Sequence, residues 1–179
     1  MCSHAARVVQ PGDTIVAMQT HGCRCNATIP THQCDCVDVR SHSNEHKKRW
    51  ILGKSYYTSK EQQALIMSDV AVYSATEASM ASLISAILSE YVYADECTIT
   101  DGTACMGTNT IPFARAFKHV NAVELDERQC EDLVDNMQTM QIMRGCKNVR
   151  VYNMGIGSDD ALIFLQHDVL YLGPPWGGG

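Results

Sequence analysis

Apolar residues recur at helical spacing in two long segments from Ser74 onward. The first segment follows Ser74-Ala-Thr-Glu77, which has the form of a capping box, and it continues to about Tyr93. The second contains the apolar stripe of residues 130–140 and reaches Gly145, a residue type that commonly ends a helix. Both segments are predicted to be helices.

Short apolar runs between and after these helices predict strands. Two more helices are expected, one starting near Asn109 or Thr110, because Pro112 fits only in a first helical turn, and one capped by Ser158. Strands that alternate with helices predict a Rossmann-like α/β fold, with a parallel sheet that binds ligands at the carboxyl ends of its strands. The predicted strands are residues 97–101, 119–125, 149–152 and 168–172.

Residues 1–50 differ in composition from the rest of the chain. They contain five of the seven histidines and five of the nine cysteines, and they show little hydrophobic periodicity. We expect an irregular Cys/His-rich appendage here. A helical lead-in over residues 51–93 and a partial α/β core over residues 94–179 are expected to follow.

The clustered cysteines of this appendage allow two interpretations. Four thiolates, or thiolates with the nearby histidines, would satisfy the tetrahedral coordination of zinc. Reduced thiols in an irregular segment are the alternative, since the total of nine cysteines is odd and no secretion signal precedes them. The candidate zinc ligands are Cys23, Cys25, Cys34 and Cys36.

The charge of the chain limits how it can meet a nucleic acid. A net charge of −6 excludes a polycationic binder, so any RNA contact requires a local patch or a base pocket. The run Lys47-Lys-Arg49 beside Trp50 is either such a patch or a solvated basic face. Without a signal peptide or a long apolar run, we expect an intracellular protein of the nucleus or cytoplasm that has no membrane partner.

Two predicted strands end in residues suited to a nucleoside ligand. Small residues from Asp101 to Asn109 let a backbone approach a ligand closely, although a tight turn without a ligand would look similar. Glu124 follows about 20 residues beyond this turn, where an acidic side chain can accept hydrogen bonds from a ribose diol. A solvated charge at a strand end is the alternative for Glu124.

The last predicted strand runs into Gly173-Pro-Pro-Trp-Gly177. The two prolines stiffen the backbone, the indole offers a stacking face, and the preceding carbonyl can point at an exocyclic amine. This arrangement suits transfer of a group to the amino group of a flat base. A proline-rich turn with a core tryptophan is the alternative.

These stretches together resemble the trimethylguanosine synthases, a family of RNA-cap guanine-N2 methyltransferases that use S-adenosylmethionine. The resemblance covers residues from about 71 to 179 and is most specific in the Pro174-Pro-Trp-Gly-Gly178 segment. It implies that capped RNA is the partner and that Trp176 stacks on 7-methylguanine, with the cationic base favouring an indole face. The residues implied to act in catalysis are Gly173, Pro174, Pro175 and Trp176. Those implied to bind S-adenosylmethionine are Asp101, Thr103, Gly107, Asn109, Glu124 and Asp126.

Four positions depart from the pattern of that family. Cys105 and Thr108 stand where the family usually has glycines, and Gly173 replaces a side-chain acceptor. Gly155 stands where an acidic residue normally contacts the adenine, and Asp159 could substitute only if its loop bends. Three functions therefore stay open: cap guanine-N2 methylation, methylation of another purine amine in RNA or DNA, and a non-catalytic cap- or nucleotide-binding module.

The number of predicted strands is also smaller than this class of sheet normally has. Four strands would leave the apolar strand 168–172 as an unpaired edge. We therefore expect a sheet truncated after the fourth strand, with a partner chain or a missing C-terminal segment completing it.

Overall fold

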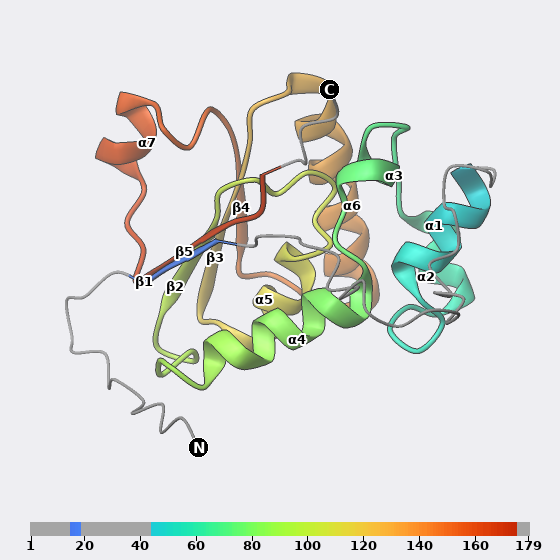
Figure 1. Cartoon of the computed structure of the whole chain (residues 1–179), viewed down its shortest axis with the longest axis horizontal. Helices are drawn as coiled ribbons and strands as arrows, with labels where there is room; N and C mark the ends of the chain where they lie inside the picture. The colour runs from blue at the N-terminus through green and yellow to red at the C-terminus, as the bar shows by residue number, and fades with distance from the viewer. Residues whose placement is uncertain (1–14, 19–43, 175–179) are drawn as a thin grey trace, which may run out of the picture.

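The computed structural model describes residues 15–18 and 44–174, and its centre is a parallel sheet in the order β1-β5-β2-β3-β4 (Figure 1). The four predicted strands and their parallel pairing are confirmed, and a fifth strand joins them. The strands are β1 Ile15–Met18, β2 Thr98–Asp101, β3 His119–Glu124, β4 Val149–Asn153 and β5 Val169–Leu172.

The described residues also form seven helices, which lie in distinct places around the sheet. In Figure 1, α1, α2 and α3 gather beside α6 at one side of the molecule, and α7 lies at the opposite side. The helices are α1 Asn44–Leu52, α2 Ser59–Ala64, α3 Ala71–Ser74, α4 Ala78–Ser89, α5 Thr110–Ala116, α6 Glu127–Arg144 and α7 Asp159–Phe164.

Aromatic residues pack α5 against the centre of the sheet. The ring of Phe113 in α5 meets that of Tyr171 in β5 edge to face, with 5.2 Å between the ring centroids, and Phe117 lies 6.0 Å away on its other side. All three side chains are buried, together with Ile99 and Val120 of the neighbouring strands. This cluster fixes the helix that follows the β2 turn, and so it fixes the turn itself.

Helix α4, the last helix of the lead-in, begins differently from the sequence prediction. The predicted capping box at Ser74 is wrong, because Ser74 ends α3 and donates its hydroxyl to the carbonyl of Val70 at 2.8 Å. Glu77 caps α4 instead, and its carboxylate accepts from the backbone amides of Ser79 and Met80. Glu77 carries the only carboxylate of this stretch, and its charge is favourable at a helix N-terminus.

Helix α4 also ends at Ser89, before the predicted end near Tyr93, whereas three other predicted helix boundaries are confirmed. Helix α5 starts at Thr110 after Asn109, and Ser158 caps α7 by accepting from the amide of Ala161 at 3.2 Å. Helix α6 ends at Gly145, whose φ of 74° is the left-handed conformation that glycine adopts at low cost.

The predicted unpaired edge at β5 is wrong. Strand β1 pairs with β5 in parallel, from Ile15 opposite Val169 to Met18 opposite Leu172. Strand β1 and most of α1 fall within residues 1–50, so this segment contributes regular structure on both sides of residues 19–43, which lie outside the described residues. The apolar strand β5 is therefore flanked on both sides.

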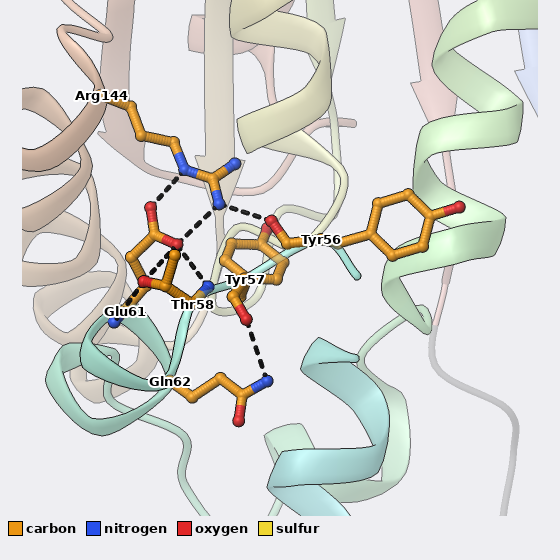
Figure 2. Close-up of polar contacts among 6 residues, drawn as sticks. All are labelled: Tyr56, Tyr57, Thr58, Glu61, Gln62 and Arg144. Carbon is orange, nitrogen blue, oxygen red and sulfur yellow. Dashed lines mark hydrogen bonds and ion pairs between the residues drawn. The ribbon is translucent and has the colours of Figure 1, made fainter. Parts of the chain in front are cut away.

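An ion pair ties the lead-in to α6 (Figure 2). The guanidinium of Arg144 binds both carboxylate oxygens of Glu61, with Nη2 2.9 Å from Oε2, and lies over the ring of Tyr57 at 4.8 Å. Thr58 completes a capping box with the same carboxylate. The Arg144 hydrogen bond lowers the pKa of Glu61 to about 2.

Among the described residues, no helix is both long and apolar enough to cross a membrane.

Candidate active site

The ends of β2, β3 and β5 meet at one edge of the sheet, which we call the carboxyl edge. Asp101, the last residue of β2, pairs in register with Ala122 of β3 and Tyr171 of β5. The turn after β2 and the turn after β5 are joined directly, because the amide of Gly173 donates to Oγ1 of Thr103 at 2.8 Å. The two turns that the sequence singled out therefore share one site.

Asp101 is the most unusual group at the carboxyl edge. Its side chain is fully buried, and Oδ2 accepts a hydrogen bond from the Thr110 hydroxyl at 2.7 Å. Its Oδ1 has no hydrogen bond of normal geometry among the described residues, although the backbone amide of Thr103 also acts to lower the pKa of this carboxyl. Burial raises the pKa of Asp101 to about 6, in opposition to the Thr110 hydrogen bond. A buried acceptor without a partner indicates a position where a ligand supplies the missing donor.

Asn109 offers a second buried acceptor nearby. Its side-chain amide donates to Oγ1 of Thr76 at 2.9 Å, and its Oδ1 has no hydrogen-bond partner within the described residues. Thr76 and Asn109 also form hydrogen bonds with the phenol of Tyr171. Burial raises the pKa of that phenol, so it stays neutral and can act as a hydrogen-bond donor.

Two glycines allow the turn after β2 to pack closely. A Cβ at Gly102 would lie 2.6 Å from Leu172 and 2.8 Å from Ile156. Gly107 has a φ of +96°, and a Cβ there would lie 2.6 Å from the methyl of Met137. Only glycine satisfies both limits, so these two residues let the turn pack closely against the side chains of the core.

Cys105 occupies a position in the same turn that would suit glycine. Its φ of 49° makes it the only non-glycine residue with a positive φ among the described residues. Its amide donates to Oε2 of Glu124 at 2.9 Å, and its thiol lies 3.4 Å from Oε1 of Gln129. Burial raises the pKa of the Cys105 thiol to about 11, so it is protonated and unreactive at neutral pH.

The end of β3 brings two more predicted residues to the site. Oε1 of Glu124 accepts from the amide of Asp126 at 2.9 Å, and Oε2 accepts from Cys105, so each carboxylate oxygen keeps a free lone pair. The carboxylate of Asp126 caps α6 by accepting from the amide of Gln129. Glu124 is thus oriented by the turn itself, whereas Asp126 has a structural function as a cap.

The turn after β5 is described as far as Pro174. A Cβ at Gly173 would lie 3.0 Å from the hydroxyl of Tyr171, so this hydroxyl borders the space where the resembled family carries a side chain. Pro175 and Trp176 lie outside the described residues, as do the candidate zinc ligands Cys23, Cys25, Cys34 and Cys36. Within the described residues, no group of three or more His, Cys, Asp or Glu side chains could hold a metal ion.

Sequence reasoning missed three polar residues of this site. Thr76, Thr110 and Tyr171 bind the side chains of Asp101 and Asn109. Tyr171 carries a usable signal, because strand alternation places it on the same face as Gly173, two positions away. Thr76 carries none, since it is brought to Asn109 across 33 positions.

The strand order and the site geometry together form an α/β domain with a candidate ligand site at the carboxyl edge of its sheet. Residues 97–179 match a protein-family model described as RNA cap guanine-N2 methyltransferase. They include all three strand ends described above, and this match supports an S-adenosylmethionine-dependent methyltransferase.

Known proteins with similar sequences or structures cover part of the chain. An uncharacterized protein of Acanthamoeba polyphaga mimivirus is 37% identical over 82 residues, which are 45% of this chain and 30% of the viral protein. This chain therefore matches less than a third of that relative.

Two solved structures are similar to part of this chain at low identity. A putative RNA methyltransferase of Pyrococcus horikoshii is 16% identical, with 70% of this chain and 61% of that one covered at a TM-score of 0.48. An rRNA methylase of Streptococcus thermophilus is 20% identical, with 49% and 50% covered at a TM-score of 0.40. Similarities this distant carry no information about the substrate of this chain.

Proposed function

We propose that this protein transfers a methyl group from S-adenosylmethionine to the guanine N2 of a 7-methylguanosine RNA cap. The observation that carries the proposal is the buried, unpartnered Oδ1 of Asp101 at the edge where the family model also matches. A fully buried carboxylate without a cation is costly, and a ligand with an ammonium group removes that cost.

The residues of the carboxyl edge fit the parts of such a donor. Asp101 and Asn109 present the two unpartnered acceptors for the ammonium of the methionine moiety. Glu124 retains acceptor capacity for the ribose hydroxyls. When bound, the donor supplies an electrophilic methyl group on a sulfonium.

The turn after β5 would position the acceptor base. We assign Trp176 to stacking on the cap base and the rigid Gly173-Pro174-Pro175 backbone to orienting the exocyclic amine. Because the amine can release its proton to solvent after attack, the site needs no dedicated base. The Tyr171 hydroxyl, next to Gly173, replaces the side chain that the resembled family has there, and it holds the turn in place.

Donor binding is the first test of this function. We expect Asp101→Asn to weaken S-adenosylmethionine binding at least about tenfold at pH 8 by calorimetry, because the ammonium loses a charged partner. Asp135→Asn is the matched control, since Asp135 is exposed on α6 away from the edge. Equal donor affinity in all three proteins, or no donor binding by a folded sample, would reject the assignment.

Cap recognition is the second test. Trp50→Phe removes the other tryptophan, which is 52% exposed in α1, and leaves the fluorescence of Trp176 as the only indole signal. We expect 7-methylguanosine cap analogue to quench this signal and to accept a methyl group. Methylation of uncapped RNA without quenching would favour another purine amine as the acceptor.

A further inference from the structure

A large groove lies at the opposite ends of the strands from the carboxyl edge. Its volume is about 890 Å³, and its lining includes Thr98, His119 and Val149, the first residues of β2, β3 and β4. Further lining comes from other residues of β3 and β4, from the ends of α5, α6 and α7, and from the loops after α6 and α7. None of the residues assigned above to the donor or to the base lines it.

Basic side chains dominate this groove. Arg115, Arg144, Lys147 and Arg150 line it together with His119, and no aspartate or glutamate does. Arg144 is neutralised by Glu61, but the other three cations form no ion pair within the described part of the chain. In a chain with a net charge of −6, such a concentration marks a local site for an anion.

Local structural functions account for only two of these cations. Arg115 and Arg144 lie in the last turns of α5 and α6, where a positive charge offsets the helix dipole. Lys147 lies in the loop before β4, and Arg150 lies on β4, so neither serves a helix end. Both side chains are exposed, and their charges are available to a ligand.

Two aromatic side chains border the same groove. Phe164 ends α7 and is 69% exposed, and Tyr152 is half-buried on β4. Exposed aromatic rings beside unpaired cations are the combination with which proteins bind single-stranded nucleic acids, the rings stacking on bases and the cations contacting phosphates. Small-molecule pockets are by contrast mostly apolar.

We propose that this groove binds a single-stranded stretch of the RNA substrate, with Lys147, Arg150 and Arg115 at its phosphates and Phe164 stacked on a base. The inference rests on the proposed RNA methylation and extends it to a second contact. The six residues of β3 separate the groove from the carboxyl edge by about 20 Å. The bound nucleotides therefore lie on the order of six positions from the modified base.

Charge reversal in the groove tests the phosphate contacts. Binding of fluorescein-labelled, uncapped oligouridine is measured by anisotropy at several salt concentrations, with the full chain. We expect the Lys147→Glu/Arg150→Glu variant to bind at least about tenfold more weakly, with a salt slope reduced by about 1.4, or 0.7 for each lost phosphate contact. The Lys54→Glu/Lys60→Glu variant has the same charge change at exposed positions outside the groove. Its oligouridine affinity and salt slope should stay close to those of the wild type.

A stacking variant separates base contact from general charge. We expect Phe164→Ala to weaken oligouridine binding about tenfold with an unchanged salt slope, and Ile163→Ala, its equally exposed neighbour outside the groove, to have no effect. Oligouridine affinity that is the same in the groove variants and their controls overturns the proposal.

The methyltransferase assignment is tested separately from the groove. Methyl transfer to a free cap dinucleotide, which is too short to reach the groove, should be unchanged in Lys147→Glu/Arg150→Glu. If the wild-type protein transfers no methyl group to capped RNA or to the cap dinucleotide, the proposed function is rejected, but groove binding can still be measured with oligouridine. If methyl transfer is intact but oligouridine binding does not depend on the groove residues, only the groove proposal is rejected.

Discussion

Two buried carboxylates show how differently the scaffold and the site of this molecule are built. Glu61 is paired with Arg144, capped by Thr58 and held at a pKa of about 2. Asp101 is fully buried with one hydroxyl partner, and its pKa is raised to about 6. The first carboxylate stabilises the folded chain, and the second costs stability until a ligand supplies a cation. A large difference in pKa between two carboxylates of one protein helps to distinguish a structural ion pair from a candidate functional group.

The largest effect is expected from breaking the paired carboxylate. Arg144→Ala leaves Glu61 buried without its cation and should destabilise the protein by about 3–5 kcal/mol in urea unfolding. Arg128→Ala, an exposed arginine of the same helix, should change stability by less than about 0.5 kcal/mol. A loss below about 1 kcal/mol in Arg144→Ala would mean that the pair contributes nothing beyond an exposed ion pair.

The pH dependence of stability gives an independent test of the Glu61–Arg144 ion pair. The pKa of Glu61 is lowered from 4.5 to about 2, so its contribution is complete above pH 4.5 and is lost as the pH falls toward 2. The full difference corresponds to about 3 kcal/mol. Thermal unfolding between pH 6 and pH 2.5 should fall more steeply for the wild type than for Glu61→Gln. Parallel curves would contradict the low pKa.

The unpaired carboxylate should behave in the opposite way. Because its pKa is raised from 3.8 to about 6, ionised Asp101 destabilises the ligand-free fold above pH 6, and this penalty disappears below pH 4. Asp101→Asn should therefore stabilise the ligand-free protein by about 1–2 kcal/mol at pH 8 and by almost nothing at pH 4. The same substitution weakens donor binding, so stability and activity change in opposite directions. Lower stability at pH 8 would show that Asp101 has a structural partner.

The sequence predicted the strands and the site turns better than it predicted the contacts between them. Strands β2 to β5 are apolar runs bounded by turn residues, and Gly145 and Ser158 end or start helices through local chemistry. Strand β1 has four residues in a segment without periodicity, and its pairing with β5 spans more than 150 positions. Nothing local encodes such a pairing.

Helix α4 shows a second limit of pattern reasoning. Its large apolar residues predicted the helix, yet Met80, Leu83 and Ile87 are each more than 40% exposed. The buried face consists of smaller residues such as Ala81 and Ser85, and the Ser85 hydroxyl donates to the carbonyl of Pro112 at 3.2 Å. Close approach to α5 favours small side chains, so the apolar stripe predicts the helix but not the face that it buries.

The smallest effect concerns strain stored beside the unpaired carboxylate. Cys105 holds a left-handed φ of 49° in the turn that we propose binds the donor. Such a conformation costs a non-glycine residue about 1–2 kcal/mol, whereas glycine adopts it freely.

At ordinary helix or strand positions a glycine variant is less stable than the alanine variant by about 0.5–1 kcal/mol, because glycine has more unfolded-state entropy. At position 105 we expect the order to reverse, with Cys105→Gly about 1 kcal/mol more stable than Cys105→Ala in urea unfolding. Both variants remove the thiol and its contact with Gln129, so their difference isolates the backbone. An alanine variant as stable as the glycine variant would show that the turn relaxes without strain, and the contrast between a relaxed scaffold and a strained site would then rest on Asp101 alone.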